Sequence, residues 1–537
     1  MWIHFEYHIP LVTYIALAKK KHPVPALSLP KVLPAVFVQF RWHSEPVRLL
    51  TIDVAVFVKN QKGYPVLPKA HQALIAKLMG LRSAPWVLLC NVGPVPNMDD
   101  DLADYSPAAF GSDFPSLSQA AASNKKHQDP TPHLSYMRNL QQRQRSRNVI
   151  ERFGMGYQDF LQAPLQPLTV NLESITYEVF EKDPIKYEWY ERAIAKALGD
   201  WEEQKKPTSD PDGKVVVAVV GAGRGPLVTR ALRASAQTGV EIDMWAVEKN
   251  PNAFVLLQRH NEQSWGGKVS LVQSDMRSWK GPRRERDAKG PPGLGTSSPD
   301  VASLVLNDPE NGAVYSHIDI LVSELLGSFG DNELSPECLD GVTHLLNPVH
   351  GISIPASYSS HLTPISAPKL HADVTNQTIT NPSAPETPYV VMLHAIDFLS
   401  NTQWASPAGH STPGENSSSS SSNRLQTSGL QSLPLPAMEL PNPLIKTAWS
   451  FSHPNRGITQ PLSPASSNSH NVRQTRLSFP CQNRGVCHGL AGYFETVLYG
   501  DVELSTNPIT MDTKSANMIS WFPIYFPLKV STKSMDM

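Results

Sequence analysis

The sequence predicts an α/β protein in which an open, Rossmann-like parallel sheet is followed by an all-β domain. Between residues 164 and 355, strand-like patterns alternate with helix-like ones, the order that gives a parallel sheet. One β-branched run there, at 214–220, stops abruptly at glycines, and short β-type runs dominate after residue 352. Residues 49–95 read as strand, helix and strand, so the N-terminal part is also α/β.

Composition limits the classes of protein to which the chain can belong. Of its 537 residues, 40% are hydrophobic and 18% are charged, which is typical of folded cores joined by polar loops. A formal net charge of -1 gives no basic field to attract nucleic acid, so we expect no direct nucleic-acid binding. The four cysteines form no CxxC pair, so we expect no metal site and a reducing compartment. The apolar run at 9–18 is too short to span a membrane and lacks the basic start of a signal peptide.

Three polar stretches interrupt the predicted elements. Residues 402–440 are rich in Ser, Pro and Asn, contain six consecutive serines and cannot bury a core, so we predict a disordered insertion there. Residues 96–132 and 281–300 have the composition of solvated loops. The loop at 96–132 would be either a domain boundary or a long excursion from a domain.

The clearest local motif is the glycine-rich turn Gly221-Ala-Gly-Arg-Gly-Pro226, which follows the β-branched run and precedes a helical pattern. Gly221, Gly223 and Gly225 allow positive φ and let backbone amides approach a ligand closely. Such glycines also serve simple packing, so the motif alone leaves a nucleotide-type ligand and a structural turn equally open.

Acidic residues follow the next two predicted strands. Glu248 ends the strand that starts at Ile242 and lies about 20 residues after the glycine turn, the spacing at which a carboxylate accepts hydrogen bonds from ribose hydroxyls. Asp275 and Met276 follow the strand at 268–274 and would hold an adenine by hydrogen bond and sulfur contact. Either acidic residue alone reads better as a solvated strand end. Because all three motifs fall at one edge of the sheet, we expect an adenosine-containing ligand, NAD or S-adenosylmethionine.

Two glutamates distinguish between these ligands. Glu324 and Glu333 follow the fourth predicted strand and flank a Gly-containing turn, so a hairpin would bring their carboxylates side by side. Two such charges push one carboxyl towards its protonated form unless a cation lies between them. A guanidinium fits best, because its planar fork of donors pairs with carboxylates in a bidentate manner. For an arbitrary pair, two exposed loop glutamates would be the plainer interpretation.

The predicted substrate is therefore an arginine side chain, and the predicted cofactor is S-adenosylmethionine. The sulfonium methyl is electrophilic, whereas an arginine nitrogen is a poor nucleophile because its lone pair is delocalised. Glutamates that grip the other nitrogens would localise positive charge away from the attacking nitrogen and align it with the methyl group, with no metal.

Longer stretches resemble the protein arginine N-methyltransferase 5 family, the type II, symmetric-dimethylating arginine methyltransferases. They are residues 177–187, 221–226, 246–252, 323–333, 335–341, 451–456, 492–499 and 520–523. The resemblance implies a partial TIM-barrel-like domain with a linker at 1–160 and a Rossmann-like class I S-adenosylmethionine methyltransferase domain at 161–352. It also implies a β-barrel domain for substrate binding and dimerisation at 353–537, which ends before the family's last strands and would be incomplete.

The resemblance also implies roles for single residues. The implied cofactor contacts are Tyr177, Lys186, Tyr187, Gly221, Gly223, Glu248, Asp275 and Met276. Glu324 and Glu333 are the implied catalytic pair. Phe180 matches the position linked to symmetric dimethylation, and Trp521 matches an aromatic residue that encloses the substrate arginine, as cation–π contact would favour. For any single Phe or Trp, an ordinary core position is the plainer explanation.

The implied function is methyl transfer from S-adenosylmethionine to a guanidinium nitrogen, giving monomethyl and symmetric dimethyl arginine, in cytoplasm and nucleus. The implied partners are proteins with Gly/Arg-rich segments, such as histones and RNA-binding proteins, an adaptor protein and further copies of the chain. One alternative is a truncated, catalytically inactive scaffold of the same family. Another is a small-molecule or nucleic-acid methyltransferase, against which the two glutamates speak because carboxylates repel phosphates.

Overall fold

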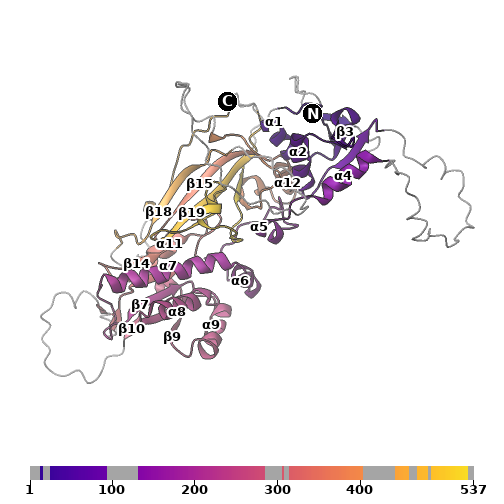
Figure 1. Ribbon diagram of the computed structural model, residues 1–537. Coiled ribbons are helices and arrows are strands. Elements are labelled where there is room, and N and C mark those ends of the chain that lie inside the picture. Colours follow the sequence, from indigo (N-terminus) through magenta and orange to yellow (C-terminus); the bar gives the residue numbers. More distant parts are fainter. Residues whose placement is uncertain are drawn as a thin grey trace, which may run out of the picture.

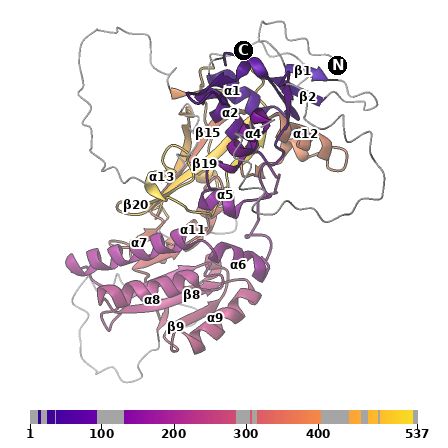
Figure 2. The same cartoon turned by 45° about the vertical axis from the view of Figure 1, so that its right-hand side comes forward.

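The computed structural model describes residues 12–15, 24–34, 36–92, 131–284, 305–307, 314–402, 442–458, 468–481 and 485–529. Figures 1 and 2 both show the C-terminal sheet, in orange and yellow, between an N-terminal unit in indigo and a central unit in magenta. The insertion predicted at 402–440, and the loops predicted at 96–132 and 281–300, lie almost entirely outside the described residues.

The central unit is a five-stranded parallel sheet in the order β14-β13-β7-β8-β9. Its strands are β7 (Val215–Val220), β8 (Ile242–Glu248), β9 (Val269–Gln273), β13 (Ile320–Ser323) and β14 (Ile352–Ile354). Every residue of β7 is buried, as expected for a parallel strand covered on both faces. The strand order reverses between β7 and β13, so their carboxyl ends flank the crevice where such sheets bind ligands. The predicted Rossmann-like fold is confirmed.

Helices cover both faces of this sheet. They are α6 (Ser174–Glu181), α7 (Pro184–Glu203), α8 (Pro226–Thr238), α9 (Pro251–Gln263) and α11 (Ser335–Thr343), with the 3₁₀ turn η2 (Met276–Ser278) and a small antiparallel sheet of β10 (Arg283–Arg284), β11 (Val305–Asn307) and β12 (Val314–Ser316). In α7, Tyr190, Ile194 and Leu198 are fully buried at helical spacing and join the core over β7. Among the described residues, no helix is both long and apolar enough to cross a membrane.

The N-terminal unit is a four-stranded sheet in the order β1-β2-β3-β6, in which β2, β3 and β6 are parallel and β1 is antiparallel. Its elements are β1 (Val12–Ile15), β2 (Val24–Ser28), α1 (Val36–Ser44), β3 (Leu49–Asp53), η1 (Val54–Val56), β4 (Val58–Lys59), β5 (Pro65–Val66), α2 (Lys69–Met79), β6 (Trp86–Cys90), α4 (Pro132–Gln142) and α5 (Val149–Phe153). Successive strands with helices between them lie side by side in a TIM barrel. The described unit has this arrangement for three strands, which agrees with the predicted partial barrel.

The C-terminal unit is a seven-stranded sheet whose described ladders are all antiparallel. Its elements are β15 (Ser357–Ser366), α12 (Pro368–Gln377), η3 (Ala384–Glu386), β16 (Tyr389–Val390), β17 (Asp397–Phe398), β18 (Lys446–Ser452), η5 (Ser469–Asn471), β19 (Gly489–Tyr499), β20 (Val502–Ser505), α13 (Met511–Lys514) and β21 (Ile524–Pro527). The predicted all-β region is confirmed. The pairings among the described residues form an open path from β16 to β17 rather than a closed ring.

One of the short β-type runs after residue 352, the run at 519–528, forms a shorter strand than its pattern predicts. The apolar run at 519–528 is a strand only over β21, because the amides of Ile519 and Ser520 donate to the buried carboxylate of Asp183 instead of to a neighbouring strand. Trp521 follows with a φ of +63°, a conformation that a β-strand cannot contain.

Candidate active site

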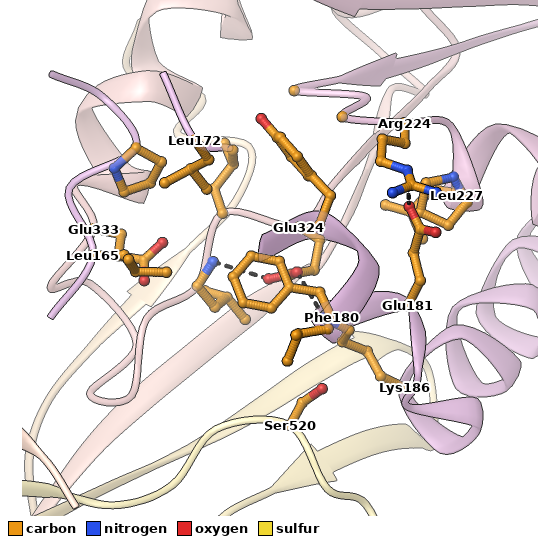
Figure 3. A pocket seen from close by; sticks show the side chains of 18 of the residues that line it. Leu165, Leu172, Phe180, Glu181, Lys186, Arg224, Leu227, Glu324, Glu333 and Ser520 are labelled. Atoms are coloured by element: carbon orange, nitrogen blue, oxygen red, sulfur yellow. Dashed lines mark hydrogen bonds and ion pairs between the residues drawn. The ribbon is translucent and has the colours of Figure 1, made fainter. Parts of the chain in front are cut away.

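A cavity of about 330 Å³ opens at the carboxyl edge of the central sheet. All twelve residues singled out from the sequence line it, namely Tyr177, Phe180, Lys186, Tyr187, Gly221, Gly223, Glu248, Asp275, Met276, Glu324, Glu333 and Trp521. Figure 3 shows Phe180, Lys186, Glu324 and Glu333 from this set together. Residues from α6, α7, β8 and η2, and from the loops that follow β7, β9 and β13 and precede β21, therefore meet in one place.

The glycine turn closes tightly over its neighbours. Gly221 has a φ of +69°, and a Cβ there would lie 2.9 Å from Leu325. A Cβ on Gly223 would lie 3.0 Å from the ring of Tyr177, which covers the turn. Gly225 has a φ of +95°, and a Cβ there would collide with Trp265. The first two glycines bring backbone to the cavity wall, whereas the third serves packing.

Glu248 is fixed at the end of β8. Its side chain is buried, and its two carboxylate oxygens accept hydrogen bonds from the amides of Gly223 and Asn250, each at 2.7 Å. Burial raises the pKa of Glu248, and these amides offset part of the effect. Each oxygen keeps a further lone pair, so the carboxylate can still accept from hydroxyl groups.

Asp275 is engaged differently from the expectation. Its carboxylate accepts from Arg277 through the backbone amide at 2.9 Å, Nε at 3.0 Å and Nη2 at 2.7 Å, which holds the pKa of Asp275 below its usual value. Its charge is thus balanced locally. Met276 is buried and its methyl carbon lies 3.4 Å from the position of a Cβ on Gly221, so it forms an apolar wall beside the turn.

The two glutamates flank a tight hairpin, as predicted. Gly327 and Gly330 exchange backbone hydrogen bonds of 3.1 and 2.9 Å. Gly330 has a φ of +82°, and the Asn332 side chain lies where a Cβ on Gly327 would be. Glu324 at the end of β13 and Glu333 before α11 both line the cavity (Figure 3).

A cation supplied by the chain itself lies against the first glutamate. Lys186 is 2% exposed, and its Nζ lies 3.0 Å from Oε2 of Glu324. Burial alone would lower the pKa of Lys186, but Glu324, Tyr187 and Asp183 together outweigh burial and the net pKa is raised. The sequence indicated a cation at this place but identified it as the substrate; Lys186 was predicted only as a cofactor contact.

Three aromatic rings surround this ammonium group. The Lys186 Nζ lies 4.8 Å from the ring centroid of Trp521, 4.9 Å from that of Tyr187 and 5.4 Å from that of Phe180. These distances are typical of cation–π contact. The cation cage is the set of four side chains around the ammonium, namely Phe180, Tyr187, Trp521 and Glu324.

Glu333 lies in a different environment from Glu324. Its carboxylate accepts no hydrogen bond from the described residues. Desolvation by the surrounding protein and the nearby charge of Glu324 raise the pKa of Glu333 to about 8, and Lys186 offsets only part of this rise. The predicted push of one carboxyl towards its protonated form thus falls on Glu333.

Asp183 was missed as a site residue. Its buried carboxylate accepts from the amides of Ile185 and Lys186 at the start of α7, and from those of Ile519 and Ser520 just before Trp521. The Asp-Pro pair before a helical pattern is a sequence signal for the helix cap. No local pattern could indicate the partners more than 300 residues away. Asp183 therefore joins two walls of the cation cage.

The described residues contain no group of three or more His, Cys, Asp and Glu side chains placed to hold a metal ion. The fold and the site together define an α/β protein of the class I methyltransferase type, with a cavity lined by acidic and aromatic side chains at the topological switch point.

Three family models match the chain in succession. The PRMT5 TIM barrel domain matches residues 16–143, PRMT5 arginine-N-methyltransferase matches 148–354, and the PRMT5 oligomerisation domain matches 357–536. The chain therefore belongs to the PRMT5 family.

Curated relatives agree with this assignment. Protein arginine N-methyltransferase skb1 of Schizosaccharomyces pombe is 39% identical over 94% of this chain and 62% of its own length. Protein arginine N-methyltransferase 5 of Xenopus laevis is 36% identical over 94% of this chain and 60% of its own. The chain thus spans less than two thirds of the length of these relatives.

Proposed function

We propose that this chain is an S-adenosylmethionine-dependent protein arginine N-methyltransferase of type II, which produces monomethyl and symmetric dimethyl arginine. The observation that carries this proposal is the cation cage, with a second glutamate beside it, at the ligand-binding edge of a Rossmann-like sheet. The three rings and the carboxylate that surround the Lys186 ammonium would also suit a guanidinium, which would take the place of that ammonium when the substrate binds. Membership of the PRMT5 family supports the same reaction.

The residues around the cavity fit the proposed cofactor. Glu248 retains lone pairs for ribose hydroxyls, and Met276 offers an apolar wall for adenine. The Lys186 ammonium would suit the carboxylate of the cofactor once the substrate arginine displaces it from the cation cage. Bound S-adenosylmethionine would supply an electrophilic methyl group on a sulfonium. Asp275 contributes less than we expected, because Arg277 already occupies much of its carboxylate.

The cation cage and the two glutamates would act on the arginine. Aromatic faces would hold the guanidinium plane and exclude water, while Glu324 would accept N–H bonds and fix the direction of the attacking nitrogen. Methylation would require the guanidinium nitrogen to lose a proton. With a pKa of about 8, the Glu333 carboxylate is suited to accept that proton near neutral pH.

We also propose substrates and partners of particular kinds. Gly/Arg-rich segments of histones and RNA-binding proteins are the proposed substrates, since the cation cage needs an accessible arginine. The match to an oligomerisation domain supports assembly with further copies of the chain. We further propose that the chain binds an adaptor protein and is located in cytoplasm and nucleus.

The test is incubation of the purified chain with methyl-labelled S-adenosylmethionine and a Gly/Arg-rich peptide, followed by separation of the methylated arginines. Monomethyl and symmetric dimethyl arginine support the proposal. A folded chain that binds the cofactor but yields no product would instead be a scaffold. If the label enters RNA and not the peptide, the substrate is a nucleic acid and not a protein.

Phe180 provides a test of product specificity. We expect Phe180→Met to change the ratio of symmetric to asymmetric dimethyl arginine, because Phe180 forms one wall of the cation cage and limits how a monomethylated guanidinium can rotate. The matched control is Phe153→Met, because Phe153 also lines the cavity but is not one of the three rings that contact the Lys186 ammonium. An unchanged product ratio for Phe180→Met would remove Phe180 from the specificity role.

A further inference from the structure

The hairpin between the two glutamates is held from the C-terminal sheet. Asp331, at the hairpin, accepts a hydrogen bond at Oδ1 from the indole Nε1 of Trp449 at 3.1 Å. Trp449 is on β18, and its direct neighbour across the ladder is Ser360 on β15. The Ser360 hydroxyl lies 3.3 Å from the same Oδ1 and 2.7 Å from the carbonyl oxygen of Phe329. Since a hydroxyl donates one proton, the shorter bond takes it and Trp449 is the main donor to Asp331.

The ring of Phe329 fastens the same hairpin to the sheet. Its centroid lies 5.4 Å from that of Trp449 and 5.0 Å from that of Phe526, both edge-on. A Cβ on Gly492 of β19 would lie 2.7 Å from the Phe329 ring, so only glycine leaves room for it. The Phe329 ring and the Asp331 carboxylate thus both contact the C-terminal sheet, and Trp449 contacts both of them.

We propose that Trp449 and Asp331 form a latch through which the C-terminal sheet positions the Glu324–Glu333 hairpin for catalysis. Neither residue lines the cavity, so both act through the hairpin as positioning residues. The inference rests on the proposed arginine methylation. Burial raises the pKa of Asp331, and the hydrogen bond from the Trp449 indole opposes that rise. Without the indole donor, the Asp331 carboxylate would be buried with too few hydrogen bonds, and the hairpin would have to move to expose it to water.

Trp449→Phe tests the latch, because it keeps a six-membered aromatic ring next to Phe329 and removes the indole donor together with its five-membered ring. The expected result is a fall in kcat of about 10-fold, by analogy with other supporting residues, with KM for the peptide and affinity for S-adenosylmethionine changed less than about twofold. Hydrogen exchange should become faster at the amides of residues 327–334. Asp331→Asn, which keeps an acceptor for the indole, should stay near wild-type activity, whereas Asp331→Leu should behave like Trp449→Phe.

The matched control is Trp245→Phe. Trp245 also donates its indole Nε1 to an aspartate, Asp243, at 2.8 Å, but on β8 and away from the cavity. Equal losses of kcat in Trp245→Phe and Trp449→Phe would overturn the latch, as would wild-type kcat and exchange in Trp449→Phe. Faster hairpin exchange only in Trp449→Phe, in a chain that methylates no arginine, would support the latch while rejecting the proposed function.

Discussion

Replacement of Glu324 or Glu333 by glutamine is expected to lower kcat by about 10²- to 10³-fold, the usual loss when one preorganised electrostatic group is removed from a transition state. An amide of the same shape cannot balance the guanidinium charge or take up its proton. Affinity for S-adenosylmethionine should change only a few fold, because the nucleotide part would contact Glu248 and Met276 rather than the hairpin. Turnover of a Gly/Arg-rich peptide and calorimetric binding of the cofactor measure the two effects separately.

The two replacements should differ in stability. Glu324→Gln leaves the buried Lys186 ammonium without its countercharge, which costs about 3 kcal/mol for a typical buried pair. Glu333→Gln removes a carboxyl whose pKa is raised, so at pH 8 or above it should leave the chain as stable as wild type or more so.

Glu337→Gln is the control for both variants. Glu337 lies in the first turn of α11, close to Glu333 in sequence, but its carboxylate accepts from Asn468 and does not line the cavity. We expect near-normal turnover from it. An equal loss of turnover in Glu337→Gln, or a loss of cofactor binding that matches the loss of turnover in the other two variants, would contradict the assigned roles.

The sheet and its glycine turn were predictable because their signals are local. A β-branched run that stops at glycines, a strand that ends in Glu248 and a strand that is followed by Asp275 depend only on neighbours in sequence and on the rule that parallel strands end at one edge. The hairpin at Gly327 and Gly330 was predictable for the same reason, since Gly-containing turns have few conformations.

What the sequence did not indicate are the contacts between distant segments. Nothing in the motif around Lys186 shows that its ammonium pairs with Glu324, because that pairing depends on how α7 crosses the end of β13. The four amides that share the Asp183 carboxylate come from two units. A buried carboxylate accepts hydrogen bonds from whichever donors the tertiary fold brings close to it, and the local sequence pattern does not indicate those donors.

The pH dependence should separate Glu333 from other groups. If the reaction needs the ionised Glu333 carboxylate, kcat/KM for the peptide should rise about tenfold per pH unit up to about pH 8 and level off above it. In Glu333→Gln, the residual activity should be lower and should lose this slope.

Stability should change in the opposite direction over the same range. The pKa of Glu333 rises from 4.5 to about 8 on folding, so the folded chain binds the proton more tightly than the unfolded chain does. The stabilisation from this proton is therefore complete below about pH 4.5 and is lost as pH rises through about 8. The free energy of unfolding of wild type and Glu333→Gln would be measured by denaturant titration from pH 5 to 9. Over this range, wild type should lose a few kcal/mol of stability relative to Glu333→Gln. If the rise in activity and the fall in stability with pH both disappear in Glu333→Gln, the Glu333 carboxyl causes both. If the slope of kcat/KM persists in this variant, the titrating group lies elsewhere in the cavity.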